Sequence, residues 1–493
     1  MNLSRLDLGI ILVYILFIIY SGTFFKKYIK NISTFLVAER SMGLHLGLAS
    51  LVSSEIGIIT YMYLSEAGFT NGFVALMIGI PFFIVFIFLG KTGFMIKPLI
   101  ETKIMTIPEL FQKKYGRGVR FYAGLLMAVG GIINFGVFPG VEARFINSVT
   151  GIPQSYVLYT IVGLLAVVLI YTALGGMVSV IFTNYVQFIL LSLGMVVITI
   201  LGVVKIGWTN IARAVESNLG AAGLNPFAAG SEFGWTFLAW QILFQLSVLT
   251  IAPYITMRIF SSKDARTGTR IFSWSSIMFL GRAFIPIFWG IMALAFLPGK
   301  PDDALEALPR LILGLTPKGL LGLILATFLA ASMSTYSSYL LSWSSVISQD
   351  LIQVAYKKIA GRDMRNKSQL VVSRLTMAAV IFFIIWWSFF FKSQELLFFY
   401  LMLAVNLFLA GTLISAVFGI YIHDEKFGVF RGRSLGAYLA FTLGAIPTVW
   451  FFFPKHPPAS QLGVWSYIMA FAGMVAGSVV QNLVRPNTGG KEA

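Results

Sequence analysis

Residues 44–67 read LHLGLASLVSSEIGIITYMYLSEA. This stretch can cross a bilayer, because a spanning helix needs about 20 mostly apolar residues. Its middle, SSEIG at residues 53–57, nevertheless combines three polar residues with a glycine, and one of the three is the carboxylate Glu55. Ionisable groups inside a span cost about 2.5–3.5 kcal/mol and usually mark function. The stretch predicts a helix interrupted where free carbonyls can coordinate an ion. Alternatively, Glu55 pairs with a polar neighbouring helix.

The composition of the whole chain agrees with a membrane protein. Of 493 residues, 58% are hydrophobic and 11% are charged, against about 25% charged in soluble domains. This excludes a soluble enzyme, a disordered chain and a coiled coil, and continuous apolar runs exclude a membrane β-barrel. The chain has no cysteine and three scattered histidines, so we expect no zinc or di-iron centre, no organic cofactor and no enzymatic activity.

The apolar runs predict about thirteen transmembrane helices in an all-α fold. They cover residues 6–25, 44–67, 72–96, 121–146, 154–173, 178–204, 233–257, 271–298, 319–346, 369–391, 395–422, 433–453 and 462–484. The first span stands alone. Spans two to six and spans seven to eleven form two sets of five. Because each set has an odd number of spans, the second set must cross the membrane in the opposite orientation to the first. We therefore predict one transporter domain over 1–493, made of a first span and loop (1–43), a first repeat (44–204), an inverted second repeat (233–422) and two final spans with a short tail (433–493).

Positive charge is distributed unevenly between the two sides of the membrane. The net charge is +17, and of 36 Lys and Arg residues 25 fall on one side, counting Arg258, and 9 on the other. Cytoplasmic loops carry the excess of Lys and Arg. This predicts an integral membrane protein, of the plasma or inner membrane, with its N-terminus outside and its C-terminus in the cytoplasm. The same asymmetry explains the net positive charge without a nucleic-acid partner. The sequence does not indicate the oligomeric state.

Further polar side chains lie inside the expected spans. Arg282 in the eighth span suits a carboxylate, either that of Glu55 or that of a solute, or it reaches toward the cytoplasmic interface. Gln241 and Gln245 lie one turn apart and precede a proline, which suggests a second interrupted helix, and Asn406 is a similar polar residue in the eleventh span. All five are candidates for contacting the solute or coupling its movement to an ion.

The ninth span carries a stripe of small and hydroxyl residues. Ala331, Ser334, Thr335 and Ser338 are spaced at i, i+3, i+4 and i+7 and therefore share one helix face. Hydroxyl oxygens there suit a monovalent cation. Close helix–helix packing through small residues is the alternative, and periodicity alone does not decide between them.

Seven short motifs carry a family resemblance. They are FLVAERS at 35–41, TIPEL at 106–110, KYG at 114–116, ARF at 143–145, YTALGG at 171–176, AASMST at 330–335 and QDL at 349–351. Together they resemble the sodium/solute symporter family, which includes sodium/proline, sodium/pantothenate, sodium/sialic acid and sodium/glucose symporters. The matches spread over about two thirds of the chain.

The resemblance implies a leucine-transporter-type five-plus-five inverted repeat that works by alternating access, with one extra N-terminal helix and two extra C-terminal helices. It also implies a main sodium site. That site would use backbone oxygens near Ser53 and Ile56, the carbonyl of Ala331, and the hydroxyls of Ser334 and Thr335.

One position departs from the family pattern. Many members carry Trp-Thr-Asp in the sixth span, where this chain reads FTNY at 182–185. In sialic acid-type relatives that Asp joins hydroxyls equivalent to Ser334, Ser337 and Ser338 in a second sodium site. Because Asn184 offers no charge, we predict at most one sodium ion per cycle.

Together these features predict sodium-coupled symport of a small organic solute into the cytoplasm. Arg282 and the positive ends of interrupted helices favour an anionic or zwitterionic solute such as a carboxylate or an amino acid. A sugar symporter, a proton-coupled or uncoupled carrier that uses Glu55, and a membrane sensor built on a transporter scaffold remain alternatives.

Overall fold

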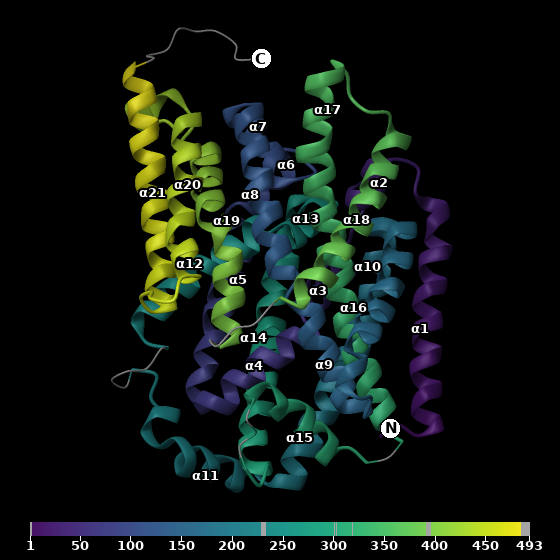
Figure 1. The fold of residues 1–493 in the computed structure, drawn as a ribbon. Coiled ribbons are helices and arrows are strands. Elements are labelled where there is room, and N and C mark those ends of the chain that lie inside the picture. The colour runs from purple at the N-terminus through teal and green to yellow at the C-terminus, as the bar shows by residue number, and fades with distance from the viewer. Residues whose placement is uncertain are drawn as a thin grey trace.

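The computed structural model describes residues 2–227, 233–299, 301, 303–317, 319–390 and 396–484. Residues 485–493 of the expected tail, residues 391 and 395 at the ends of two expected spans, and 228–232 lie outside the described residues. The described part is helical and contains no β-strand, and an isolated parallel bridge joins Met42 to Ser262. Most helices run nearly side by side along one direction (Figure 1).

The described residues of the first half of the chain form eleven α-helices. They are α1 (Arg5–Phe25), α2 (Ile32–Val37), α3 (Leu44–Ser54), α4 (Ile58–Asn71), α5 (Gly79–Thr92), α6 (Ile96–Glu101), α7 (Ile107–Tyr115), α8 (Arg117–Phe135), α9 (Phe138–Thr150), α10 (Val157–Ile206) and α11 (Trp208–Leu219).

In the second half, the part that the structure describes forms ten α-helices and a π-helix, η7. They are α12 (Trp235–Ile251), α13 (Pro253–Ser261), α14 (Ala265–Phe296), α15 (Ala307–Leu315), α16 (Leu321–Ser345), η7 (Val346–Ile352), α17 (Gln353–Ala360), α18 (Asn366–Ser388), α19 (Leu397–Tyr421), α20 (Ser434–Phe451) and α21 (Ala459–Val484).

Ten described helical stretches are long and apolar enough to cross a membrane, and the bent pair α12 and α13 makes eleven. The count is lower than the expected thirteen because the helices divide differently from the apolar runs. The 50-residue α10 holds two expected spans and bends at Gly176, whose φ of 49° suits glycine. The stretch Ile58–Thr92 joins half of the second expected span to the third, while Leu44–Ser54 is too short to count alone.

Both expected helix interruptions are present. The first separates α3 from α4 at residues 55–57, where Gly57 is extended and begins α4. The hydroxyl of Thr60 stabilises the break by donating to the Glu55 carbonyl (3.2 Å). The second lies at Ala252, which is extended because a proline follows it, and α12 and α13 meet there at 48°.

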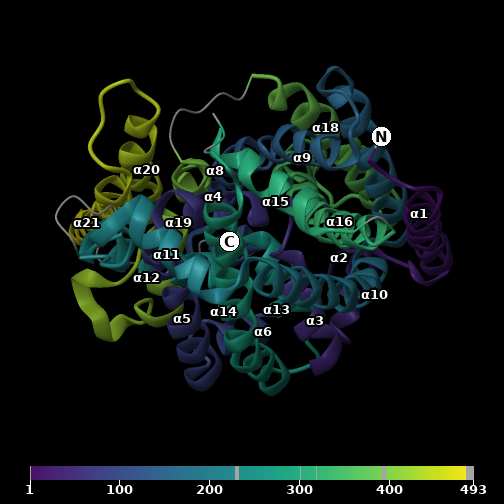
Figure 2. The same ribbon diagram turned by 90° about the horizontal axis from the view of Figure 1, so that it is seen from below.

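The helices differ strongly in their burial. In the most apolar stretch of the α16 segment 89% of the residues are buried, compared with 22% for α1. Helix α1 lies at one edge of the molecule and the α20 and α21 pair at the opposite edge (Figures 1 and 2). The beginning of α1 and the end of α21 point to opposite ends of the molecule (Figure 1). Helix α16 is therefore the central element, and the interrupted α3 and α4 pack beside it.

Candidate cation and solute site

The expected main sodium ligands on two different elements lie together. The Ser334 hydroxyl lies within hydrogen-bonding distance of two carbonyl oxygens that can accept its proton, that of Ser53 at 2.7 Å and that of Ala331 at 2.8 Å. Ser53 lies in the last turn of α3, directly before the interruption, and the other two lie on α16. The structure therefore joins the interruption to the hydroxyl-bearing stripe.

The other two expected ligands lie at the same junction. A Cβ added to Gly57 would lie 3.0 Å from Thr335 Oγ1, so this hydroxyl faces the interruption one residue after Ile56. The hydroxyls of Thr335 and Ser53 are buried and have no hydrogen-bond partner among the described residues. Neutral carbonyl and hydroxyl oxygens are the groups that coordinate Na⁺ in interrupted helices. The donor set and its unpaired buried oxygens therefore fit a sodium ion.

Glu142 is a buried carboxylate at this junction that the sequence analysis did not single out. It lies on α9, is fully buried, and accepts hydrogen bonds from the Ile59 N–H (3.0 Å) and from the Ser332 hydroxyl. Its Oε1 would lie 3.3 Å from a Cβ on Gly57. The carboxylate therefore occupies the N-terminal, positive end of α4 and connects three helices. The rule that identified Glu55, an ionisable group inside an expected span, also applies to Glu142.

A guanidinium occupies the region of the expected second cation site. Arg258 of α13 is 1% exposed and donates to the Ser338 hydroxyl, to the Ser50 hydroxyl (3.3 Å) and to the Tyr254 carbonyl. The amide of Asn184 lies 3.4 Å from the Ser338 hydroxyl. In the amide orientation that satisfies its neighbours, the Asn184 oxygen accepts from Arg258 at 3.2 Å. The prediction that Arg258 lies in a cytoplasmic loop was therefore wrong.

The two remaining hydroxyls of the expected second site bond to their own helix. Ser337 donates to the Ser334 carbonyl at 3.1 Å, and Ser338 donates to the same carbonyl at 2.7 Å. Arg258 forms no ion pair with a carboxylate among the described residues. A permanent positive charge therefore lies where a second sodium ion would need oxygen ligands.

Glu55 and Arg282 are adjacent, but they are not ion-paired in the described part of the chain. Arg282 Nε donates to the Glu55 carbonyl at 2.7 Å, and the guanidinium lies over the rings of Phe82 and Phe279 at 5.1 and 5.2 Å. The two charged side chains are 6% and 5% exposed. Glu55 Oε1 and Arg282 Nη1 have no hydrogen-bond partner in the structure as described. Two residues that are joined through the Glu55 carbonyl thus each retain an unpartnered charged-group atom, an acceptor on Glu55 and a donor on Arg282.

The remaining polar candidates are buried and are not hydrogen-bonded to this pair in the described structure. Gln245 donates to Gln241 at 3.0 Å, while the Gln241 amide nitrogen, the Gln245 amide oxygen and both amide atoms of Asn406 lack partners among the described residues. No hydrogen bond in the described structure links these three amides to Glu55 or Arg282. The structure therefore brings together only part of the set predicted from the sequence.

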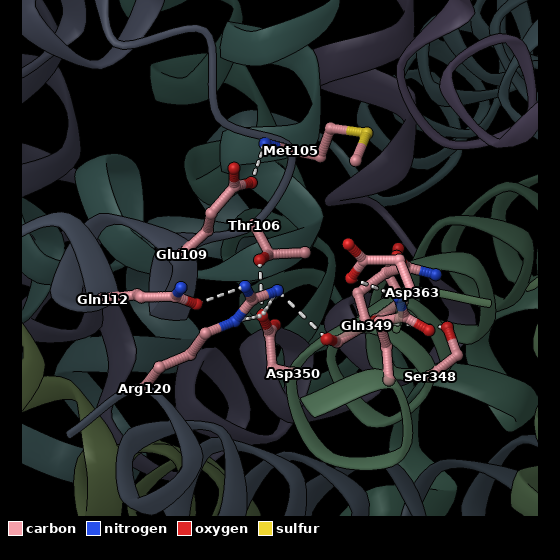
Figure 3. Close-up of polar contacts among 11 residues, drawn as sticks. Met105, Thr106, Glu109, Gln112, Arg120, Ser348, Gln349, Asp350 and Asp363 are labelled. Atoms are coloured by element: carbon pink, nitrogen blue, oxygen red, sulfur yellow. Dashed lines mark hydrogen bonds and ion pairs between the residues drawn. The ribbon is translucent and has the colours of Figure 1, made fainter. Parts of the chain in front are cut away.

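A second polar network lies at the far end of α16 (Figure 3). The fully buried Asp350 of η7 accepts from Thr106 Oγ1 and from Arg120 Nε, both at 2.8 Å. Arg120 also donates to the Gln349 carbonyl (3.0 Å) and to Gln112 Oε1 (2.7 Å). This network, the Asp350 network, joins α7 and α8 to η7. Thr106, Gln349 and Asp350 belong to two of the motifs that carry the family resemblance, and no other sequence signal connects them.

Comparison with known proteins places this geometry in a family. Residues 35–436 match the model of the sodium:solute symporter family. The chain belongs to this family. Sodium/glucose cotransporter 4 of Danio rerio is 24% identical, with 71% of this chain and 58% of that protein aligned. The sodium/myo-inositol cotransporter of Mus musculus is 22% identical, with 93% and 69% aligned. The chain thus spans less than two thirds of the length of the first of these relatives.

Two solved structures show the same fold. A Na⁺-coupled sialic acid symporter in a substrate-bound outward-open state superposes with a TM-score of 0.80 at 18% identity, and the match covers 97% of this chain and 98% of that one. Mhp1, a nucleobase-cation-symport-1 family transporter, superposes with a TM-score of 0.57 at 17% identity over 92% and 95% of the two chains. These matches confirm the expected leucine-transporter-type fold.

Proposed function

We propose that the protein is a secondary transporter that couples inward movement of a small solute to one sodium ion. The observation that carries the proposal is the contact of the Ser334 hydroxyl with the Ser53 carbonyl, beside the unpartnered Thr335 hydroxyl. It joins the central helix to an interrupted one at a point where neutral oxygens converge. Family membership supports sodium as the ion.

The proposed cycle uses the junction as a conformational switch. A sodium ion bound to α3 and α16 at once would stabilise the arrangement in which these two elements are close. A ligand shifts a conformational equilibrium only by its differential affinity for the two states. We assign the high-affinity state to the outward-facing form, so that sodium release to the cytoplasm permits the inward-facing form. The beginning of α1 and the end of α21 point to opposite ends of the molecule (Figure 1), which agrees with the N-outside, C-inside orientation that we propose for a plasma or inner membrane.

Coupling to a single sodium ion follows from Arg258. Its guanidinium already donates to Ser338 and can donate to Asn184, so these oxygens are engaged by a cation that never leaves. A sodium ion at this position would also face a like charge in a low-dielectric interior, where repulsion is strong.

We also keep the division into repeats at 44–204 and 233–422, since each begins with an interrupted helix.

We propose a zwitterionic solute, such as an amino acid, or a carboxylate. Arg282 Nη1 would donate to a carboxylate and Glu55 Oε1 would accept from an ammonium group. A sugar is the second candidate, because two of the relatives are named as sodium/glucose and sodium/myo-inositol cotransporters. The unpartnered amides of Gln241, Gln245 and Asn406 could bind hydroxyls.

The test is solute uptake into proteoliposomes that contain the purified protein. Thermal-shift measurements with amino acids, carboxylates and sugars, in sodium or potassium, would first select the solute. We expect a shift with amino acids or carboxylates that requires sodium, and uptake that stops when choline replaces sodium. Uptake driven equally well by a proton gradient in choline would contradict sodium coupling. A sodium-dependent shift with sugars alone would overturn the proposed solute class but not the coupling.

A further inference from the structure

A basic groove opens at the end of the molecule that holds the Asp350 network. It has a volume of about 630 Å³ and lies between the start of α8 and α17, with Gln112 of α7 and Asp363 also in its lining. Its lining includes four cationic side chains and one carboxylate: Arg117, Arg120, Lys357, Lys358 and Asp363. Lys357 pairs with Asp363 at 2.8 Å, and Arg120 is committed to the Asp350 network. The groove therefore carries a net positive charge.

Two of these cations are available to a ligand. The side chains of Arg117 and Lys358 are exposed and form no hydrogen bond or ion pair with a described residue. The hydrogen bond from Lys357 lowers the pKa of the Asp363 carboxyl, and the Arg117 charge also acts on this carboxyl and helps to lower its pKa. By the charge asymmetry of the sequence, this end of the molecule faces the cytoplasm. Anionic lipids give the cytoplasmic leaflet a negative surface potential that attracts basic segments next to the membrane.

An apolar groove lies further along the same helices. It has a volume of about 730 Å³ and is formed by α8, η7 and α18. Thr376 supplies the only hydroxyl of its lining, and the rest is aliphatic or aromatic. That lining includes Val129 of α8, Ile352 of η7 and Ala379 of α18.

The basic and apolar grooves follow one another along two shared elements. Ile352 lines the apolar groove and the next residue, Gln353, lines the basic one. On α8, Phe121 of the basic groove and Val129 of the apolar groove are eight residues apart on one face, because 3.6 residues make a turn. Leu125 lies between them on that face, and all three are exposed. An apolar path therefore connects the two grooves.

We propose that this pair of grooves binds one anionic phospholipid from the bilayer. The phosphate headgroup would lie at Arg117 and Lys358, and an acyl chain would lie in the apolar groove between α8 and α18. A free phosphate ion would leave the apolar groove unused, and a zwitterionic lipid would leave the excess positive charge unneutralised. Because Arg120 belongs to both the basic groove and the Asp350 network, the lipid would stabilise the packing of α8 against η7.

The experiment measures lipid binding to the purified, delipidated full chain by native mass spectrometry. The probes are dioleoyl phosphatidylglycerol, dioleoyl phosphatidylcholine, glycerol 3-phosphate and inorganic phosphate. We expect phosphatidylglycerol to bind at least about tenfold more tightly than the other three. Arg117→Gln combined with Lys358→Gln should weaken phosphatidylglycerol binding about tenfold. Lys263→Gln combined with Arg266→Gln, an equal loss of charge at exposed residues outside the groove, should leave it within about twofold.

A second pair of variants tests the acyl-chain groove. Ala379→Phe fills the apolar groove and should also weaken phosphatidylglycerol binding, whereas Ala378→Phe, on an exposed neighbouring position outside the groove, should not. Equal binding of phosphatidylcholine, equal binding of glycerol 3-phosphate, or unchanged binding by Ala379→Phe would each overturn the proposal. Equal binding of phosphatidylcholine would show that the site does not select negative charge. Either of the other two results would show that no acyl chain lies in the apolar groove.

Discussion

The main and second cation regions of α16 lie one helical turn apart and treat positive charge in opposite ways. At Ser334 and Thr335, neutral oxygens from two helices converge, and the hydroxyls of Ser53 and Thr335 remain unpartnered among the described residues. At Ser338, the oxygens are already engaged by the Arg258 guanidinium. The carboxylates are distributed in the opposite sense, since Glu142 borders the main site while Asn184 replaces an acid at the second. Under the proposed coupling, the Arg258 guanidinium would take the place of a second ion.

Removing the Ser334 hydroxyl would have the largest effect. Ser334→Ala removes the group that joins Ser53 to α16, and we expect apparent sodium affinity to fall about 100-fold, equivalent to about 2.8 kcal/mol. Sodium titration of intrinsic fluorescence or of uptake would measure it. Ser344→Ala is the matched control, because Ser344 is also buried on α16 and donates only to its own helix (3.0 Å). Equal losses in both variants would mean a general defect of α16.

The charge of Glu142 should have the next largest effect. Glu142→Gln keeps the size of the side chain but removes the negative charge beside the main site, and we expect sodium affinity to fall about tenfold. The same titration measures it. Glu66→Gln serves as control, since Glu66 is also a buried carboxylate of the α4 region and bonds the Leu397 N–H instead (3.2 Å). Unchanged sodium affinity in Glu142→Gln would show that this carboxylate serves only to hold α4 in place.

Two substitutions should make the second cation region resemble the main one. Asn184→Asp combined with Arg258→Met exchanges the built-in cation for a carboxylate, and the Hill coefficient for sodium should rise from about 1 toward about 2. Asn184→Asp alone should leave it at about 1, because the new carboxylate would pair with Arg258. The sodium dependence of initial uptake rates measures both. A Hill coefficient near 2 in the unmodified protein would contradict the role given to Arg258.

The smallest effect is expected at Ser337. Its hydroxyl donates to the Ser334 carbonyl within the same helix, and such local bonds contribute little. Ser337→Ala should therefore change sodium affinity by less than about twofold. A much larger loss in the sodium titration would place this hydroxyl among the ion's ligands.

The sequence predicted the fold well because its signals are local. Glycine and proline mark the interruptions at Gly57 and Pro253, and apolar run length marks the spans. It also predicted the convergence of Ser53 with Ser334, through a family resemblance rather than through spacing. The number of separate helices was less predictable, because α10 continues through its bend at Gly176.

Long-range contacts explain what the sequence analysis missed. Arg258 lies near a span end and reads as a loop cation, and only packing shows that it is buried against Ser338. Glu142 lies within an expected span, but its bond to the Ile59 N–H joins residues far apart in the chain. Asp350 likewise meets Thr106 and Arg120 only in three dimensions.

The most direct test of the central claim is the number of sodium ions that the purified protein binds at saturation, measured with radioactive ²²Na⁺. The account predicts one ion per chain, lost in Ser334→Ala and retained in Ser344→Ala. Two ions per chain, or one ion that persists in Ser334→Ala, would contradict it.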